Sequence, residues 1–381
     1  MLQKYEDVVI RSSLMKKERL NKNIFAGLLL FLLSVSGVGC AFTTTGPFLR
    51  DLAEKKDIYL GAAITLDELE ETEYARTVAR EFNMVVPENH LKWAYIHPEK
   101  DRYDFSGVDR IVHFAMEHQM KIRGHTLLWH EAIPAWLAAD GGNGEEIKAS
   151  FSKGELEKVL EEHIKTVVAR YRGKIQYWDV VNEVFESSSH SKELRKTFWL
   201  TVLGEEYIEK AFTWAREADG EARLFINEFR IERKNPKSDA LYEMIKSLRK
   251  KGIPVDGVGF QLHLDLEENP DFQGIETNIR RFIELGLEVQ FTEVDVGIRG
   301  EVTNEKLERQ AEIYKGLLEI AAKYPQVTAF VTWGVTDRYS WLPGFGAEVL
   351  KSKIPYGSGL LFDAHYKEKP AYYAIIKILN K

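Results

Sequence analysis

Cysteine is almost absent from this sequence of 381 residues, which contains Cys40 and no other cysteine. A single cysteine cannot form an intrachain disulfide, and a cysteine-based metal site is excluded as well. The chain also lacks an excess of basic residues, because 52 Lys and Arg stand against 59 Asp and Glu, for a net charge of -7. Nucleic acid is therefore a poor candidate partner, and a neutral or weakly charged substrate fits better.

Long apolar runs are scarce too, and the longest lies near the N-terminus. Residues 24–39 form an apolar run that is too short to span a bilayer comfortably, and a basic stretch that begins at Met15 precedes it. This layout predicts a signal peptide over residues 1–40. We expect translation to begin at Met15, because Glu6 and Asp7 do not suit the basic start of a signal peptide.

The end of this segment resembles the cleavage site of bacterial lipoproteins, in which the cysteine carries the lipid, although Gly37 stands where leucine is usual. We therefore expect an extracytoplasmic protein, either secreted or held at the cell surface by a lipid on Cys40. That lipid would be its only link to a membrane. A retained anchor helix with a buried cysteine is the alternative. Residues 41–51 are expected to form a linker, and residues 52–381 a single catalytic domain.

Beyond the linker, short apolar runs alternate with amphipathic stretches, which favours βαβ units and a parallel sheet. Helical patterns such as residues 156–170 and 305–323 lie between the runs. Eight strands, each followed by a helix, predict a (β/α)8 TIM barrel of the α/β class. A doubly wound open sheet is the alternative, but no glycine-rich phosphate loop follows the first strand. The expected strands are residues 59–64, 84–87, 122–129, 176–183, 223–227, 257–264, 288–295 and 329–335.

Polar and aromatic residues gather at the carboxyl ends of these expected strands, where barrels of this type build their active sites. Polar groups at such depths are unfavourable unless they have partners or a task. Following the strands in order, the candidates are Glu88, Asn89 and Lys92; His125 and Trp129; Asn182 and Glu183; Asn227 and Glu228; Gln261 and His263; Glu293 and Asp295; and Trp333 and Trp341.

The alternation of side chains along a strand sorts these candidates, because residues two apart point to the same side. Gln261 and His263 should share a face, and the same holds for Glu293 and Asp295 and for His125 and Trp129. Asn182 and Glu183 are adjacent, so strict alternation would place them on opposite faces. Both can serve one site only if their strand twists or bulges at its end.

Two glutamates on different strands, surrounded by amides, imidazoles and indoles, are what retaining glycoside hydrolysis requires. One carboxyl protonates the leaving oxygen, and the other attacks the sugar carbon from the opposite side. His263 and Asp295 would hold Glu293 ionised by hydrogen bonding, and Asn182 would bind the 2-hydroxyl of the sugar. The tryptophan rings offer flat apolar faces to sugars, although a lone tryptophan on a barrel strand is more often part of the core.

Over nearly the whole of residues 52–380, the sequence resembles the endo-1,4-β-xylanases of glycoside hydrolase family 10. The matching motifs are residues 88–93 (ENHLKW), 123–130 (RGHTLLWH), 178–183 (WDVVNE), 259–263 (GFQLH), 292–295 (TEVD) and 332–337 (TWGVTD). Together these motifs are very specific.

The resemblance implies a (β/α)8 barrel that cleaves internal bonds of xylan and xylo-oligosaccharides with net retention, with Glu183 as the acid/base and Glu293 as the nucleophile. It implies no cofactor, although some relatives bind structural calcium, and we expect a monomer without a catalytic metal. The residues implied around the cleaved sugar are His125, Trp129, Asn182, Gln261, His263, Trp333 and Trp341. Glu88, Asn89 and Lys92 would bind the next sugar on the non-reducing side.

The chain departs from the family pattern at two places. Where the family commonly shows Asn-Asp-Tyr-Asn, residues 227–230 read Asn-Glu-Phe-Arg, which removes a tyrosine hydroxyl and adds a cation. Because relatives use this region for the sugar on the reducing side, the preference for leaving groups is open. Ala132 stands where many relatives have glutamine, so one hydrogen bond to the glycone would be missing.

Three other functions are alternatives to xylan hydrolysis. A zinc enzyme is disfavoured, because His130 and Glu131 lack a second histidine and Pro134 would break the helix that carries such a motif. A non-catalytic glycan-binding lipoprotein would be favoured by loss of either glutamate, but both are present. A barrel hydrolase of β-1,4-glucan differs only in admitting the hydroxymethyl group that xylose lacks.

The segment after the last strand, residues 342–359, is long for a barrel connection and is rich in glycine. We expect it to form one wall of the cleft and to limit which xylan substitutions are tolerated. Phe345 and Tyr356 would be exposed and would stack on sugars, and Lys351 and Lys353 would meet acidic side groups. A solvated surface loop without a role is the alternative.

Overall fold

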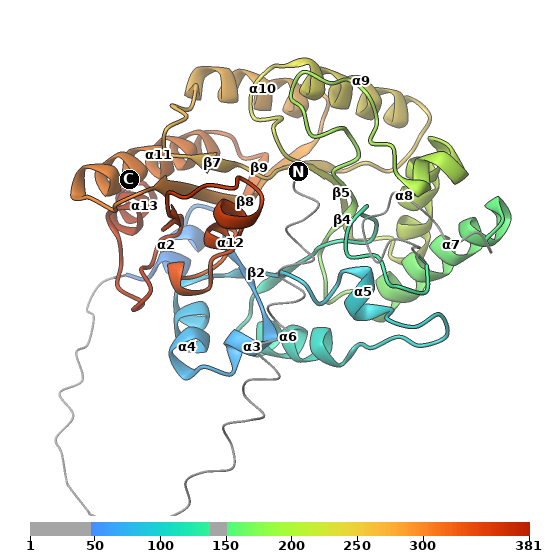
Figure 1. Ribbon diagram of the computed structural model, residues 1–381, viewed down its shortest axis with the longest axis horizontal. Coiled ribbons are helices and arrows are strands. Elements are labelled where there is room, and N and C mark those ends of the chain that lie inside the picture. The colour runs from blue at the N-terminus through green and yellow to red at the C-terminus, as the bar shows by residue number, and fades with distance from the viewer. Residues whose placement is uncertain (1–46, 138–150) are drawn as a thin grey trace, which may run out of the picture.

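Eight parallel strands close on themselves within residues 47–137 and 151–381, the part of the chain that the computed structural model describes (Figure 1). Each strand pairs with the next, and the last pairs with the first, where Phe330 lies beside Leu60. This closure confirms the predicted (β/α)8 TIM barrel. The barrel strands are β1 (Tyr59–Ile64), β2 (Met84–Pro87), β3 (Lys121–Gly124), β4 (Tyr177–Asn182), β5 (Arg223–Glu228), β6 (Gly257–Phe260), β8 (Glu288–Arg299) and β9 (Val327–Thr332).

Helices surround the strands, as the outer ring of coils in Figure 1 shows. Several of them begin at a residue that caps the free N–H groups of the first turn. Ser152 forms a capping box with Glu155, and Asn235 and Thr303 each accept an N–H three residues on. The helices are α2 (Leu49–Glu54), α3 (Leu66–Leu69), α4 (Thr72–Glu81), α5 (Trp93–Ile96), α6 (Ser106–Glu117), α7 (Lys153–Arg170), α8 (Glu206–Ala218), α9 (Pro236–Lys250), α10 (Phe272–Glu284), α11 (Asn304–Lys323) and α13 (Pro370–Leu379).

The eighth strand was predicted over residues 329–335, but β9 spans Val327–Thr332. Two other predicted strands were much too long. The third ends at Gly124, not at residue 129, so His125 and Trp129 do not share a strand. The sixth, predicted over residues 257–264, is two strands: β6 ends at Phe260, and β7 (His263–Asp265) pairs with the outer part of β8. The break falls at Leu262, whose φ of 63° lies in the left-handed region and cannot continue an extended strand.

The barrel interior contains a cluster of apolar side chains and, in contact with it, a group of buried polar side chains. The apolar cluster is Ala63, Met84, Val86, Tyr177, Phe225, Ala329, Val331 and Trp333. Gly257 is needed for this packing, because a Cβ there would lie 2.3 Å from the Phe225 ring. In the polar group, Arg123 donates to both carboxylate oxygens of Asp179 and, at 2.5 Å, to Gln290 Oε1.

The loop predicted over residues 342–359 contains a helix and a short strand. These are α12 (Leu342–Glu348) and β10 (Tyr356–Gly357), which pairs antiparallel with the end of β8. Phe345 is half-buried and Tyr356 is only 9% exposed, so the prediction that both aromatics are exposed was wrong. Their rings lie 6.4 Å apart, centroid to centroid, and pack on each other instead.

The predicted signal peptide, the start at Met15 and the lipidation of Cys40 all lie outside the described residues. Helix α2 begins at Leu49, three residues before the predicted start of the domain, and its Leu49, Leu52 and Ala53 are buried. None of the helices in residues 47–137 and 151–381 is long and apolar enough to cross a membrane.

Candidate active site

A cleft of about 240 Å³ opens at the carboxyl ends of the barrel strands. Its lining includes all the candidate residues at the strand ends except Asn227, Glu228 and Asp295, which are fully buried. Strands β4, β7 and β8 and the segments that follow β2, β3, β5, β6 and β9 contribute side chains. Residues as far apart in the chain as Glu88 and Tyr356 therefore meet in one cleft.

Strand β4 is irregular before its end, the chain leaves the extended conformation at Glu183, and Asn182 and Glu183 both line the cleft. The pairing of β4 with β5 shifts register between Asp179 and Val181, which changes the alternation of side chains. Glu183 then takes a φ of 56°, and its N–H donates to Asn227 O at 3.0 Å. A bulky residue in this conformation is strained, and such strain collects at functional sites.

Glu293 is surrounded by hydrogen-bond donors. Asn227 Nδ2 donates to Glu293 Oε1 at 2.6 Å, and His263 Nε2 lies 3.1 Å from Glu293 Oε2. Burial alone would raise the pKa of this carboxyl, but the hydrogen bond from His263 and the nearby charge of His125 outweigh it and lower the pKa. Glu293 is therefore an ionised carboxylate that is available as a nucleophile.

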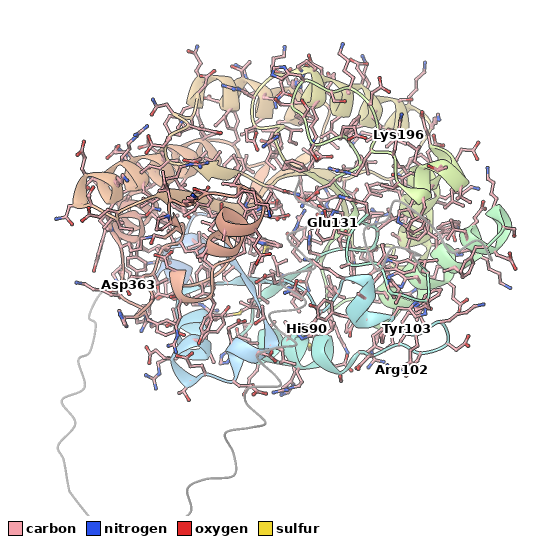
Figure 2. The ribbon with its side chains drawn as sticks, in the orientation of Figure 1. His90, Arg102, Tyr103, Glu131, Lys196 and Asp363 are labelled. Atoms are coloured by element: carbon pink, nitrogen blue, oxygen red, sulfur yellow. The ribbon has the colours of Figure 1, made fainter. Side chains whose placement is uncertain are left out.

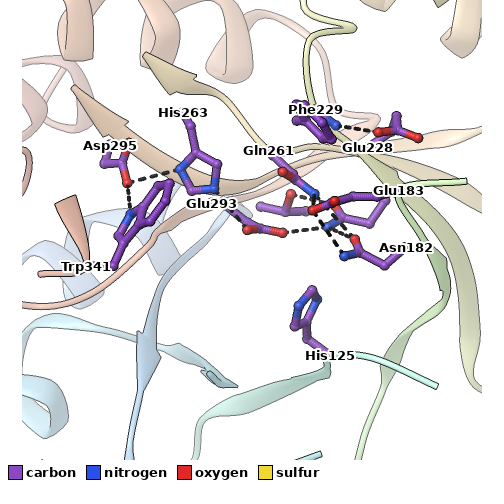
Figure 3. Close-up of polar contacts among 12 residues, drawn as sticks. His125, Asn182, Glu183, Glu228, Phe229, Gln261, His263, Glu293, Asp295 and Trp341 are labelled. Carbon is purple, nitrogen blue, oxygen red and sulfur yellow. Dashed lines mark hydrogen bonds and ion pairs between the residues drawn. The ribbon is translucent and has the colours of Figure 1, made fainter. Parts of the chain in front are cut away.

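His263 owes its charge to a second carboxylate. Its Nδ1 lies 3.0 Å from Asp295 Oδ2, which also accepts the indole N–H of Trp341 at 2.7 Å (Figure 3). Burial opposes the charged ring, but Asp295 and Glu293 together raise the pKa of His263 to about 10. The ring is then an imidazolium that donates to both carboxylates. Asp295 thus acts on Glu293 through His263 and also orients Trp341.

Glu183 lies across the cleft from Glu293, and Figure 3 shows both carboxyl groups directed toward the same space. Gln261 Nε2 donates to Glu183 Oε1 at 3.2 Å, and Asn182 Nδ2 does so at 3.4 Å. Asn227 also donates to Asn182 Oδ1, at 2.9 Å. A chain of amides therefore connects the two carboxyl groups.

His125 forms the floor of the cleft below the two glutamates. Its Nδ1 lies 3.0 Å from Asp179 Oδ2, and its ring meets the Trp333 ring edge-on with centroids 5.3 Å apart. Burial raises the pKa of Asp179, but the charge of Arg123 and the contacts with His125 bring it below the usual range. The ionised Asp179 holds the imidazole of His125 in place, and the Trp129 ring is 6.2 Å from it.

The residues that the resemblance assigns to the next sugar form a compact group at the end of β2. Lys92 Nζ donates to Asn89 Oδ1 at 3.1 Å and lies 4.8 Å from the centre of the Trp129 ring. Burial raises the pKa of Glu88, and the charge of Lys92 partly offsets this effect. The group offers both donors and acceptors to sugar hydroxyls.

The departure at the end of β5 has a structural explanation. Glu228 points away from the cleft and pairs with the fully buried ammonium of Lys237 at 2.8 Å. The Lys237 ammonium also lies 3.7 Å from the centre of the Phe229 ring, which lines the cleft. Lys237 therefore supports the ring that stands where relatives have tyrosine. Arg230 adds an exposed cation beside it.

Figure 2 shows Glu131 near the centre of the view, over the barrel, and Arg102 near the outer edge of the molecule. Glu131 and Ala132 both line the cleft. Burial, and then the charge of Arg195, lower the pKa of His130 to about 3, so this ring is neutral and its Nε2 lies 3.2 Å from Glu131 Oε1. The region described by the structure contains no group of three or more His, Cys, Asp or Glu side chains that could hold a metal ion.

Two residues that contact the glutamates of the cleft escaped the sequence prediction. Asn227 was noted at the end of a strand but was given no role, although it contacts Glu293, Asn182 and Thr292. Its position in the polar series of strand ends was the available signal. Arg195 lies in an irregular segment twelve positions beyond Glu183, and nothing in the sequence pattern marks it.

The fold and the cleft define a (β/α)8 hydrolase of the two-carboxylate type. The chain belongs to glycosyl hydrolase family 10, whose profile matches residues 48–378. It is 42% identical over 361 residues to endo-1,4-beta-xylanase B of Thermotoga neapolitana. That alignment covers 93% of this chain and 98% of the relative.

Two further relatives agree with this membership, which the resemblance predicted. Beta-1,4-xylanase of Dictyoglomus thermophilum is 41% identical over 346 residues, or 86% of this chain and 91% of that protein. The crystal structure of xylanase 10B from Thermotoga petrophila RKU-1 in complex with xylobiose aligns with a TM-score of 0.80 and 43% identity. That alignment covers 87% of this chain and 97% of the other.

Proposed function

We propose that this chain is an endo-1,4-β-xylanase that cleaves xylan by two successive displacements, with Glu293 as nucleophile and Glu183 as acid/base. The observation that carries the assignment is the contrast in their surroundings. Glu293 receives hydrogen bonds from Asn227 and from a charged His263, which keep it ionised. Glu183 has longer contacts, with two neutral amides at 3.2 and 3.4 Å and with the guanidinium of Arg195 at 3.9 Å.

In the first step, a Glu293 carboxylate oxygen forms a bond to the anomeric carbon. The bond from that carbon to the glycosidic oxygen breaks, and its electron pair stays on the oxygen, which takes the proton of Glu183. His125, Trp333 and Trp341 enclose the sugar, and the amide of Asn182 is placed to bind its 2-hydroxyl.

In the second step, Glu183 is a carboxylate and removes a proton from water as the water oxygen bonds to the anomeric carbon. The bond to Glu293 breaks, and its electron pair returns to that carboxylate. Two inversions at the same carbon give net retention. Both halves of the cycle use only side chains of the cleft.

The test is release of reducing sugar from xylan and from carboxymethylcellulose in parallel, by the wild type and by Glu293→Gln. We expect hydrolysis of xylan by the wild type, little on the cellulose, and none by the variant. Comparable rates on both polymers would contradict selection for xylose. Persistent activity of Glu293→Gln would contradict the assigned nucleophile.

We also propose that residues 1–40 direct export and that Cys40 carries a lipid. The apolar run and the cysteine that follows it support this proposal. Cells expressing the whole chain should hold it in the membrane fraction on the outer side, and Cys40→Ser should release it into the medium. A wild-type protein that stays inside the cell would contradict export. A precursor peptide covering residues 3–11 would contradict the start at Met15.

A further inference from the structure

Arg195 places a guanidinium against Glu183, from the irregular segment between β4 and the π-helical turn η1 (Trp199–Leu203). Its Nε donates to Glu183 O at 3.2 Å, and its Nη2 lies 3.9 Å from Glu183 Oε2. Two further hydrogen bonds hold Arg195 in place. Its Nη1 donates to Ser187 Oγ at 3.2 Å, and its backbone N–H donates to Val184 O at 2.8 Å.

Packing alone does not explain the position of the Arg195 Nη2 atom. It is buried, and within residues 47–137 and 151–381 it makes no hydrogen bond. The side chain as a whole is only 16% exposed. An N–H group that is removed from water without an acceptor is unfavourable. A movement of about 1 Å would bring it from 3.9 Å into hydrogen-bond distance of the Glu183 carboxylate, since such bonds span about 2.7–2.9 Å.

The carboxyl group of Glu183 is surrounded by donors. Gln261 and Asn182 donate to Oε1, and Arg195 stands beside Oε2. Donors and a cation favour the ionised carboxyl over the protonated one. In the described part of the chain, none of the contacts to this carboxyl offers an acceptor for its proton. The glycosidic oxygen of a bound substrate would therefore be the acceptor.

The charge balance changes during the cycle. In the free enzyme, the negative charge of Glu293 opposes ionisation of Glu183, because like charges disfavour each other. In the glycosyl-enzyme intermediate, Glu293 is an ester without charge, and the Arg195 cation is then unopposed.

We propose that Arg195 is a positioning residue that holds Glu183 as a carboxylate and thereby serves the second step, in which Glu183 must accept a proton. The proposal rests on the assignment of Glu183 as acid/base. In that step the water oxygen bonds to the anomeric carbon, the bond to Glu293 breaks with its electron pair, and the water proton passes to Glu183. A purely structural role, tying residues 184–187 to Arg195, makes different predictions.

The test uses Arg195→Gln, which removes the charge, and Arg195→Lys, which keeps it. On xylo-oligosaccharides, we expect the alkaline limb of kcat/KM for Arg195→Gln to move up by about one pH unit, since an opposite charge at about 4–6 Å has an effect of this size. An aryl xylobioside with a good leaving group makes the second step limiting. On that substrate, the kcat of Arg195→Gln should fall about tenfold on the acidic side of the pH profile. It should recover with azide, because azide attacks without a general base. Arg195→Lys should keep both limbs near the wild type.

Controls separate this proposal from the one on which it rests. Arg110→Gln, at an exposed arginine far from the cleft, should leave both limbs in place. Glu183→Ala, with its β-azide product, tests the acid/base assignment by itself, and adding Arg195→Gln to it should not change the azide-supported rate. If Arg195→Gln does not fold, Ser187→Ala loosens the guanidinium and should move the alkaline limb the same way by less. An alkaline limb that stays in place, or an equal loss at every pH without azide recovery, would overturn the proposal.

Discussion

The two carboxyl groups of the cleft sit in contrasting surroundings. Glu293 lies within the long strand β8 and is held by Asn227 and by a His263 that is itself fixed by Asp295. Glu183 lies one residue beyond β4, and its contacts with side-chain donors are longer, at 3.2–3.9 Å. Rigid donors suit a nucleophile that must stay ionised, whereas looser contacts suit a group that changes protonation twice in each cycle. Environment, not residue type, separates the two roles.

The largest effects should come from removing either carboxyl. Glu293→Ala and Glu183→Ala should each lower hydrolysis of xylan by about 10⁴-fold or more. They should differ on an aryl xylobioside with a good leaving group, because such a group needs no acid. Glu183→Ala should keep much of its first step there, and azide should speed its turnover and give a β-azide.

The products distinguish the two assignments. Azide that rescues Glu293→Ala should attack the free face of the sugar and give an α-azide. The opposite pairing of variant and product, measured by NMR of the glycosyl azides, would reverse the roles of the two glutamates.

A smaller loss should follow from weakening the rigid side alone. Asn227→Ala removes the 2.6 Å hydrogen bond to Glu293, and kcat/KM should fall by about 10²–10³-fold, as for loss of one donor to a developing charge. Asn278→Ala removes a fully buried asparagine of α10 that donates to Ile231 O, and it should lower the melting temperature while leaving kcat/KM intact. Equal kinetics of Asn227→Ala and wild type would show that His263 alone is sufficient.

The charge of His263 makes this side sensitive to pH. Its pKa is about 10 in the folded protein, against 6.5 ordinarily, so folding takes up a proton between these values. The stabilisation is fully present below about pH 6.5 and is lost as the pH rises through about 10, and it is on the order of a few kcal/mol. Unfolding by urea should therefore show the largest difference between wild type and His263→Gln near about pH 6, with a smaller one near about pH 9.5. A difference that grows with pH would contradict the imidazolium.

The smallest effect should come from changing the outer wall of the cleft, to which residues 342–359 contribute. Leu342, Phe345, Leu350 and Tyr356 line the cleft there, and Lys351 is exposed beside them. Replacing the segment by a Gly-Ser bridge between Leu342 and Gly359 should change the products from glucuronoxylan more than those from unbranched xylo-oligosaccharides. We expect shifts of a few-fold, because exposed charge pairs contribute about 0.2–1 kcal/mol. Identical products from both substrates, with an unchanged melting temperature, would show a surface without a role.

Much of the barrel could be predicted from the sequence because buried parallel strands leave a strong pattern. The bounds of β1 and β2 agree with the predicted ones. Strand β4 is one residue shorter than predicted at each end, and β5 is one residue longer at its C-terminal end. The failures fall beside the cleft, at His125 and Leu262, where the chain leaves the extended conformation to aim side chains. Periodicity cannot anticipate such breaks, because tertiary contacts select them.

By itself, the sequence determined the class of fold and the set of groups at the strand ends, since strand and helix periods and the motifs around Glu183 and Glu293 are local properties of the chain. Only the tertiary structure decided how those groups act on one another. The irregular pairing of β4 with β5, the contact of Asn227 with Glu293 and the approach of Arg195 to Glu183 each join segments that come together only on folding. The charge of His263 depends on two carboxylates that lie 30 and 32 positions away in the chain. Electrostatic interactions of this kind depend on distance and burial, and neither quantity exists before the barrel has closed.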